Sequence, residues 1–313
     1  MLVRDQTDTK GQTRMSVLPT LSTMTTSIAE TILQGAHMLR LNGVPEARRE
    51  AGSLLAHVLG RDRSFILSHA EDAIEEKQSE IFQGYLQRRA EGEPVQYITG
   101  HQEFFGLDFE VNRNVLIPRP ETELLIETVL KLFASADEAP FICDVGTGSG
   151  CIAITLVHEL PQSRAVALDI SPEALAVAER NAARHSVSDR IEFLVSDCFE
   201  ALSAPDAQQS RFDLIVSNPP YVEQGAMAGL QKEVRDFEPH TALVAGDDGL
   251  AVIRRLLSEA GSFLKTSGFL LFEIGFNQAA AVEQLIDRAT WNPLGIHADL
   301  QGIPRTVALE KLS

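Results

Sequence analysis

The chain has 313 residues, 44% of them hydrophobic, and a formal net charge of −17 from 27 basic and 44 acidic residues. This length predicts one or two domains, and no run approaches the ~18 apolar residues of a membrane span. Affinity for nucleic acid rests heavily on phosphate neutralisation by lysine and arginine, so the acidic balance counts against a nucleic-acid-binding protein. Three cysteines without metal-ligand spacing predict a reduced, cytoplasmic protein with no metal site.

The first part of the chain reads as a tail followed by helices. Residues 1–26 are rich in Thr, Ser and Gln and lack the apolar core of a signal peptide, so we expect a disordered tail. In residues 27–94 apolar residues recur at helical spacing, and Asn42-Gly43 and Gly60 mark helix ends. We therefore expect a small all-helical domain with no catalytic residues.

A β linker is expected at residues 95–117. Phe104–Val111 alternates apolar and polar residues around a glycine, which is typical of a hairpin. Pro118 and Pro120 then stiffen the entry to an amphipathic helix, Glu121–Phe133. Its first acidic residues suit the positive end of a helix dipole, and the residues alone leave open whether they do more.

From Phe141 onward, strands and helices alternate. Strands are expected at Phe141–Val145, Ala165–Asp169, Ile191–Val195, Phe212–Val216, Gly268–Ile274, Ile296–Leu300 and Thr306–Leu309, and helices at Cys151–Glu159, Ala174–Arg184, Leu250–Leu264 and Ala279–Ala289. This order predicts an α/β fold with a doubly wound, mostly parallel sheet in residues 118–313. Ligands of such sheets bind at the C-terminal ends of the strands, where Asp169, Asp197 and Asn218 are expected.

A glycine loop, Gly146-Thr147-Gly148-Ser149-Gly150, follows the first of these strands. Its spacing differs from the Gly-x-Gly-x-x-Gly of dinucleotide enzymes, and glycine lets the backbone approach a ligand closely. Asp169 suits ribose hydroxyls, Asp197-Cys198-Phe199 marks where an adenine would lie, and Asp144 is expected to support the loop. Without a His or Lys constellation for hydride transfer, these parts favour S-adenosylmethionine as the cofactor.

The fourth strand ends at Ser217-Asn218-Pro219-Pro220-Tyr221. The prolines cannot continue a ladder and bias Asn218 toward an extended conformation, which predicts a stiff corner. The Asn218 oxygen and the Pro219 carbonyl can each accept one N–H of a planar NH2 group, while Tyr221 stacks on its face. The nitrogen would then point its electron density at an electrophile, with alignment and carbonyl dipoles as the catalysis. A simple proline-rich turn is the alternative interpretation.

Together these residues resemble the protein-(glutamine-N5) methyltransferases that modify peptide-chain release factors, over about residues 28–311. The specific parts are the helical domain, Gly100–Phe109, Ile117–Glu123 and Glu238–Leu243 with Gly246. The resemblance implies a class I, Rossmann-like methyltransferase sheet, and methyl transfer from S-adenosylmethionine to the side-chain amide nitrogen of the glutamine in the Gly-Gly-Gln motif of class I release factors. It implies cofactor contacts at Gly146, Thr147, Gly148, Ser149, Gly150, Asp169, Cys198 and Asn218. It implies substrate contacts at Asn218, Pro219, Pro220 and Tyr221, with Asn218, Pro219 and Tyr221 catalytic.

One departure from the family is Cys198, where many members carry a bulky aromatic beside the adenine. We expect Phe199 or another residue to supply the missing surface. We also expect a monomer whose helical domain helps to recognise a release factor, and no direct contact with membrane or nucleic acid.

Two other interpretations stay open. An N6-adenine or N2-guanine nucleic-acid methyltransferase would use the same corner on an exocyclic amine, and the negative charge counts against it. A cofactor-binding or interaction module that has lost its chemistry is the third, and intact Asn218 and Tyr221 argue against it.

Overall fold

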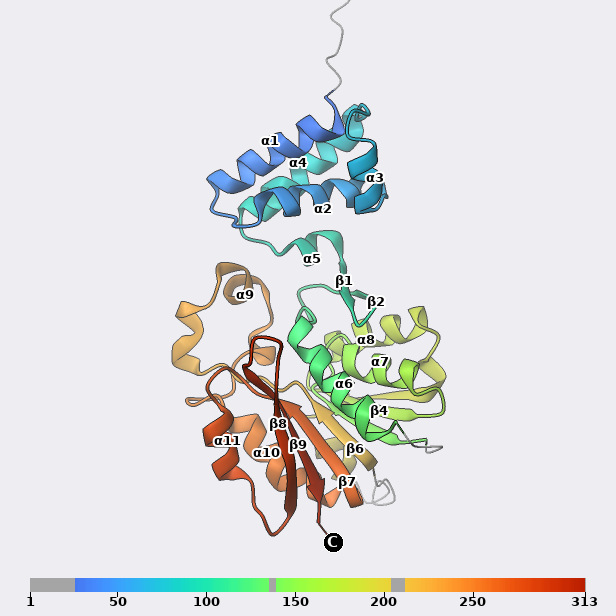
Figure 1. Ribbon diagram of the computed structural model, residues 1–313, viewed down its shortest axis with the longest axis vertical. Helices are drawn as coiled ribbons and strands as arrows, with labels where there is room; N and C mark the ends of the chain where they lie inside the picture. Colours follow the sequence, from blue (N-terminus) through green and yellow to red (C-terminus); the bar gives the residue numbers. More distant parts are fainter. Residues whose placement is uncertain (1–25, 135–138, 204–211, 313) are drawn as a thin grey trace, which may run out of the picture.

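The computed structural model describes residues 26–134, 139–203 and 212–312. They form a helical domain and a sheet domain joined by a short linker (Figure 1). The tail expected at residues 1–26 lies outside the described residues except for Thr26. Across these three ranges, no helix combines the length and the apolar composition that crossing a membrane requires.

The N-terminal domain is all-helical, as predicted. Its helices are α1 (Ile28–Leu41), α2 (Ala47–Leu59), α3 (Arg63–Ser68) and α4 (Glu76–Ala90). Ser27 begins α1 with a capping box, in which its hydroxyl accepts from the Glu30 N–H and the Glu30 carboxylate accepts from the Ser27 N–H. Apolar side chains at helical spacing then meet in one core, which includes Leu39, Leu54, Leu55, Phe82 and Leu86.

The linker expected as β is helical in its first residues. Pro94 precedes α5 (Val95–Thr99), and Gly100, with a φ of +80°, ends it. The apolar run in this segment is too short to separate strand from helix by periodicity, so the expectation was wrong there. The hairpin itself is present, with β1 (His101–Phe104) antiparallel to β2 (Leu107–Glu110).

The sheet domain has the predicted doubly wound topology. Its strands are β3 (Phe141–Val145), β4 (Arg164–Asp169), β5 (Ile191–Val195), β6 (Phe212–Ser217), β7 (Leu264–Glu273), β8 (Trp291–Ala298) and β9 (Pro304–Lys311). They lie in the order β5-β4-β3-β6-β7-β9-β8, and only the pairs that include β9 are antiparallel. The helix expected to reach Leu264 ends earlier, because β7 begins at that residue.

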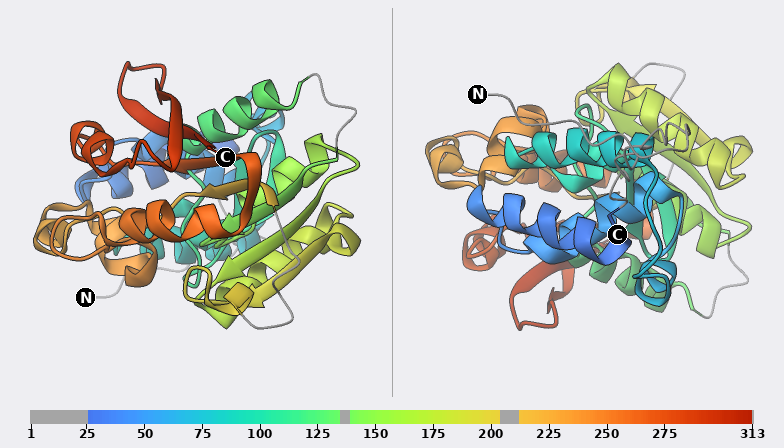
Figure 2. Two further views of the ribbon diagram at one scale, coloured as in Figure 1. Left: turned by 90° about the horizontal axis from the view of Figure 1, so that it is seen from below. Right: turned by 90° about the horizontal axis from the view of Figure 1, so that it is seen from above.

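Helices cover both faces of this sheet (Figure 2). They are α6 (Glu123–Leu132), α7 (Cys151–Glu159), α8 (Pro172–Arg184), α10 (Ala251–Glu259) and α11 (Ala279–Leu285). A further short helix, α9 (Lys232–Phe237), lies next to the helical domain instead (Figure 1). Successive strand residues point to opposite faces, so Ile142 and Leu214 pack in a core with α6 and α7. Cys143 and Ile215 pack in the other core, with α10 and α11. Both faces of the sheet are thus buried, and the ends of the strands are the part of the sheet that a ligand can reach.

Candidate active site

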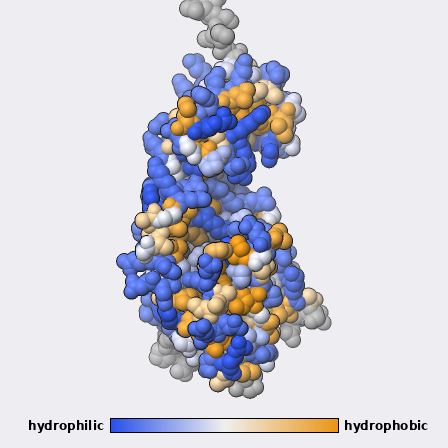
Figure 3. Space-filling model, turned by 60° about the vertical axis from the view of Figure 1, so that its left-hand side comes forward, coloured by the Kyte–Doolittle hydropathy of each residue, from blue (hydrophilic) through white to orange (hydrophobic). Residues whose placement is uncertain are grey.

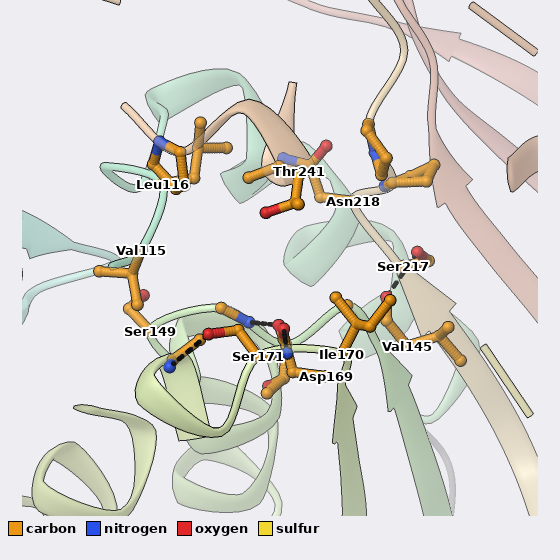
Figure 4. A pocket seen from close by; sticks show the side chains of 18 of the residues that line it. Val115, Leu116, Val145, Ser149, Asp169, Ile170, Ser171, Ser217, Asn218 and Thr241 are labelled. Atoms are coloured by element: carbon orange, nitrogen blue, oxygen red, sulfur yellow. Dashed lines mark hydrogen bonds between the residues drawn. The ribbon is translucent and has the colours of Figure 1, made fainter. Parts of the chain in front are cut away.

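A cavity of about 300 Å³ lies at the C-terminal ends of the parallel strands. Val115 and Leu116 of the linker lie across it from Ser217, with Asp169 at its base (Figure 4). The predicted site residues in its wall are Gly146, Thr147, Gly148, Ser149, Asp169, Cys198, Asn218, Pro219 and Pro220. Gly150 and Tyr221, by contrast, are not among the residues that line it. The structure therefore brings the glycine loop, the ends of β4 and β5 and the proline corner to one site.

The glycine loop is held from below by β4. The N–H groups of Gly146 and Thr147 both donate to the Leu168 carbonyl, at 2.8 and 2.9 Å. Gly150 has a φ of +81°, and a Cβ there would lie 2.7 Å from Ile154 Cδ1. Gly150 therefore acts indirectly, by letting α7 start tightly against the loop.

Buried polar groups brace the same loop. Asp144 accepts from Thr147 Oγ1 at 2.7 Å and from the Ala153 N–H at 3.2 Å, and burial raises the pKa of Asp144 to about 7. Asn181 of α8 donates to the carbonyls of Ser149 and Glu110, at 2.9 and 3.0 Å. Asp144 thus supports the loop, as expected, and Asn181 joins the loop to the hairpin.

Asp169 stands at the end of β4, between the loop and α8. Its Oδ2 accepts from the Gly148 N–H at 2.8 Å, and its Oδ1 accepts from the Ser171 N–H at 2.9 Å. Burial raises the pKa of Asp169, and these backbone donors oppose that rise. A carboxylate has about four lone-pair sites, so this one can still accept from hydroxyl groups in the cavity.

The end of β5 differs from the expectation in one respect. Cys198 lines the cavity with a φ of +48°, and the Asp197 carboxylate pairs with Arg255. Phe199 is 1% exposed and stacks on Phe263, with ring centroids 5.1 Å apart. Of the two alternatives, Phe199 does not supply the surface beside Cys198, because its ring is buried in the core. The apolar wall is instead aliphatic, with Val115, Leu116, Val145, Ile152, Ile170, Val244 and Val252.

The proline corner is tied to the loop and presents two acceptors. Ser217 Oγ donates to the Val145 carbonyl at 2.7 Å, and Asn218 Nδ2 donates to Thr122 Oγ1 at 3.0 Å. Within the described part of the chain, no group donates to Asn218 Oδ1 or to the Pro219 carbonyl. Both residues line the cavity, so a ligand with two N–H donors has partners there.

Tyr221 is held by residues at the end of β7 and just after it. Its hydroxyl donates to Glu273 Oε1 at 3.4 Å, and its carbonyl accepts from Gln278 Nε2 at 3.1 Å. The ring lies close to Gly275, where an added Cβ would be 3.0 Å from Tyr221 Cδ2. Tyr221 is thus a fixed part of the corner.

Sequence reasoning missed Glu273, Thr122 and Gln278 as parts of the site. Glu273 is 1% exposed at the end of β7, and Thr122 Oγ1 donates to its Oε2 at 2.6 Å. Burial raises the pKa of Glu273 to about 7. The available signal was an acidic residue that ends an apolar run, Phe269–Phe272, at the ligand-binding edge of the sheet.

An ion pair joins the two segments that cover the cavity. Arg119 Nη2 donates to both carboxylate oxygens of Glu238, at 2.6 and 2.8 Å. Burial raises the pKa of Glu238, and Arg119 opposes that rise. The residues beside each partner line the cavity, among them Pro118, Thr122, Pro239 and Thr241.

As for metals, no cluster of three or more His, Cys, Asp or Glu residues suited to an ion is found in ranges 26–134, 139–203 and 212–312.

Comparisons with known proteins agree with these features. The family model described as PrmC N-terminal domain matches residues 30–100, and the one described as Methyltransferase small domain matches residues 120–234. A release factor glutamine methyltransferase of Koribacter versatilis is 45% identical over 267 residues, which are 85% of this chain and 92% of that protein. One from Cereibacter sphaeroides is 40% identical over 280 residues, which are 90% of this chain and 97% of that protein.

Solved structures share the fold at low sequence identity. The hMettl16 catalytic domain in complex with a MAT2A 3'UTR hairpin has a TM-score of 0.52 and 15% identity. The match covers 83% of this chain and 93% of that one. It supports the Rossmann-like methyltransferase fold alone. On the identity to its curated relatives, the chain belongs to the release factor glutamine methyltransferase family, as predicted, and is an S-adenosylmethionine-dependent methyltransferase.

Proposed function

We propose that the enzyme methylates the side-chain amide nitrogen of the glutamine in the Gly-Gly-Gln motif of class I release factors. The observation that carries this proposal is the pair of acceptors, Asn218 Oδ1 and the Pro219 carbonyl, on the wall of a cavity that also holds the glycine loop. A primary amide offers two coplanar N–H donors, which match two acceptors. The names of the relatives, release factor glutamine methyltransferase, support the choice of substrate.

The cavity residues fit S-adenosylmethionine. Its ribose hydroxyls would donate to the Asp169 carboxylate, its adenine would lie in the aliphatic wall beside Cys198, and the loop Gly146–Gly150 would follow its methionine part. Asn218 would border both cofactor and substrate. When bound, the cofactor supplies a methyl group on a cationic sulfur, and the carbon of that methyl group is the electrophile.

The corner then acts by alignment and by charge. Asn218 Oδ1 and the Pro219 carbonyl accept the two N–H groups, which fixes the plane of the substrate amide and aims its nitrogen into the cavity. As the nitrogen forms its bond to the methyl carbon, the bond from that carbon to sulfur would break, and the two oxygen dipoles stabilise the positive charge that the nitrogen gains. The nitrogen would then lose one N–H proton to water, which leaves a neutral methylated amide, and S-adenosylhomocysteine would depart. We assign Pro220 to the stiffness of the corner and Tyr221 to packing on the amide, with its ring held through Glu273.

A protein substrate needs more surface than the cavity offers. The molecule is hollowed between the helical domain and the sheet domain (Figure 3). We propose that a release factor enters there and touches both domains, with a monomeric enzyme in the cytoplasm. The net charge of −17 remains the argument against a nucleic-acid substrate.

The test is transfer of labelled methyl from S-adenosylmethionine to a purified class I release factor. We expect label on the intact factor, and none on a copy whose Gly-Gly-Gln glutamine is changed to alanine or on unmethylated DNA. Asn218→Ala should lower kcat by about 100-fold or more, because an acceptor that aligns the nucleophile is lost. Binding of S-adenosylhomocysteine to that variant should stay within a few-fold of wild type.

Two results would contradict the proposal. Label on the alanine copy or on DNA would mean that the corner holds a different amine. An unchanged rate in Asn218→Ala would remove the role assigned to that side chain, whatever the substrate.

A further inference from the structure

Behind the corner lies a chain of polar groups that the amide-binding step does not itself use. The Thr122 hydroxyl donates to Glu273 Oε2 at 2.6 Å, and the Tyr221 hydroxyl donates to Glu273 Oε1 at 3.4 Å. Asn218 Nδ2 donates to Thr122 Oγ1 at 3.0 Å. The chain therefore starts at a buried carboxylate and ends at the amide that lines the cavity.

The Glu273 carboxylate is almost fully buried, which is uncommon for an acidic side chain. Thr122 and Glu273 are each 1% exposed. Burial and the nearby Glu121 raise the pKa of Glu273 to about 7, while the hydroxyl donors and the charge of Arg305 favour its ionised form. Above that pH Glu273 is ionised, and it can then only accept hydrogen bonds.

The direction of each hydrogen bond follows from this. Thr122 has one hydroxyl proton, and it donates this proton in a hydrogen bond to the ionised Glu273. The lone pairs of Thr122 Oγ1 are left to accept, and only the Nδ2 end of Asn218 can donate to them. The Oδ1 end then faces away from Thr122, and Asn218 lines the cavity.

We propose that Thr122 and Glu273 are positioning residues for the methyl transfer, because they hold the Asn218 amide with Oδ1 toward the cavity. This inference rests on the proposed function, in which Oδ1 accepts an N–H of the substrate amide. The two orientations of an asparagine amide have nearly the same shape, so packing alone does not choose between them. In a flipped Asn218, Oδ1 would face the Thr122 oxygen, which is also an acceptor. Its Nδ2 would face the N–H of the substrate amide, which is also a donor.

The same strand end also holds the backbone of the corner. Gln278 Nε2 donates to the carbonyls of Tyr221 and Gly249, at 3.1 and 3.2 Å, and its Oε1 accepts from the Gly275 N–H at 2.8 Å. Glu273 at the end of β7 and Gly275 and Gln278 just after it therefore hold both the side chains and the backbone of the corner.

The test compares two substitutions of one residue. Thr122→Val keeps the shape and removes the hydroxyl, whereas Thr122→Ser keeps the hydroxyl. At alkaline pH, where Glu273 is ionised, Thr122→Val should lower kcat for methyl transfer by about 10- to 100-fold, with KM for S-adenosylmethionine within about twofold. Thr122→Ser should recover most of the rate.

Thr155 offers a matched control. Its hydroxyl is buried and has no hydrogen-bond partner in the described ranges, so Thr155→Val makes the same change where no chain is broken. That variant should keep the wild-type rate. If Thr122→Val alone fails to fold, the double variant Thr122→Val/Glu273→Met removes the orphaned carboxylate as well, and it should be folded but slow.

A second readout does not need methyl transfer. With nitrogen-15-labelled asparagine, the side-chain amide signal of Asn218 is the one missing from Asn218→Ala. Its N–H protons should exchange with water about tenfold faster in Thr122→Val than in wild type or Thr122→Ser.

Each outcome decides a separate point. Equal exchange in all three proteins would overturn the proposed orientation of Asn218. Faster exchange with an unchanged kcat in Thr122→Val would overturn the positioning role. If the wild-type protein methylates no release factor, the proposed function fails, and the exchange rates still report on the orientation.

Discussion

At the scale of single residues, Gly150 meets two constraints that alanine cannot meet. Its φ is +81°, and an added Cβ would lie 2.7 Å from Ile154 Cδ1 and 3.1 Å from Ala178 Cβ. We expect Gly150→Ala to lower the free energy of unfolding by roughly 3 kcal/mol, the sum of a left-handed backbone and overpacking. The loop should shift as well, so binding of S-adenosylhomocysteine should weaken about tenfold or more. Denaturant unfolding and calorimetry measure both effects.

Gly60 separates the two causes. It has a φ of +61° at the end of α2, and nothing lies within 4 Å of an added Cβ. Gly60→Ala should therefore cost only the backbone term, about 1 kcal/mol, and leave cofactor binding unchanged. Equal losses in the two variants would mean that crowding at Gly150 has no consequence.

At the scale of elements, the segments that cover the cavity depend on the ion pair between Arg119 and Glu238. The Glu238 side chain is 1% exposed and the Arg119 side chain 30%. Arg119→Met should leave a buried carboxylate unpaired and lower the free energy of unfolding by roughly 3 kcal/mol. Denaturant unfolding measures the loss, and KM for S-adenosylmethionine should rise because the cavity wall loosens.

The control for this prediction is an exposed ion pair. Lys131 and Glu127 lie 3.5 Å apart on α6, with side chains 74% and 53% exposed. Lys131→Met should change stability by less than about 0.5 kcal/mol. If both variants lose the same amount, the buried pair is worth no more than a surface pair.

Features that depend on local sequence were predictable, whereas contacts between distant elements were not. The sheet was predictable because buried strands alternate with helices, and the loop and corner because glycine and proline act locally on the backbone. Thr122 and Glu273 are 151 residues apart in the sequence, and only the packing of the segment before α6 against the end of β7 brings them together. The ring of Phe199 was misplaced for a similar reason, since its partner Phe263 lies in a distant segment.

At the scale of the whole molecule, α9 of the sheet domain contacts the helical domain. Arg89 of α4 pairs with Glu50 in its own domain, and its Nη2 lies 2.7 Å from Glu233 Oε2 of α9. The Lys232 side chain packs against Gly92 beside this pair. In Figure 1, α9 accordingly lies directly below the helical domain. Two domains joined by so few contacts are expected to move relative to each other unless such pairs hold them.

Removing this ion pair should therefore weaken binding of the protein substrate and leave binding of the cofactor unchanged. In Glu233→Ala, Arg89 keeps Glu50, so the helical domain stays intact while its tie to α9 is lost. A pair worth about 1 kcal/mol corresponds to a rise of about fivefold in KM for the release factor, with kcat and S-adenosylhomocysteine binding unchanged. Asp236→Ala is the control on the same helix, since Asp236 pairs with its neighbour Arg235. An unchanged KM in Glu233→Ala, or an equal rise in both variants, would mean that the tie between the domains does not set how the release factor is held.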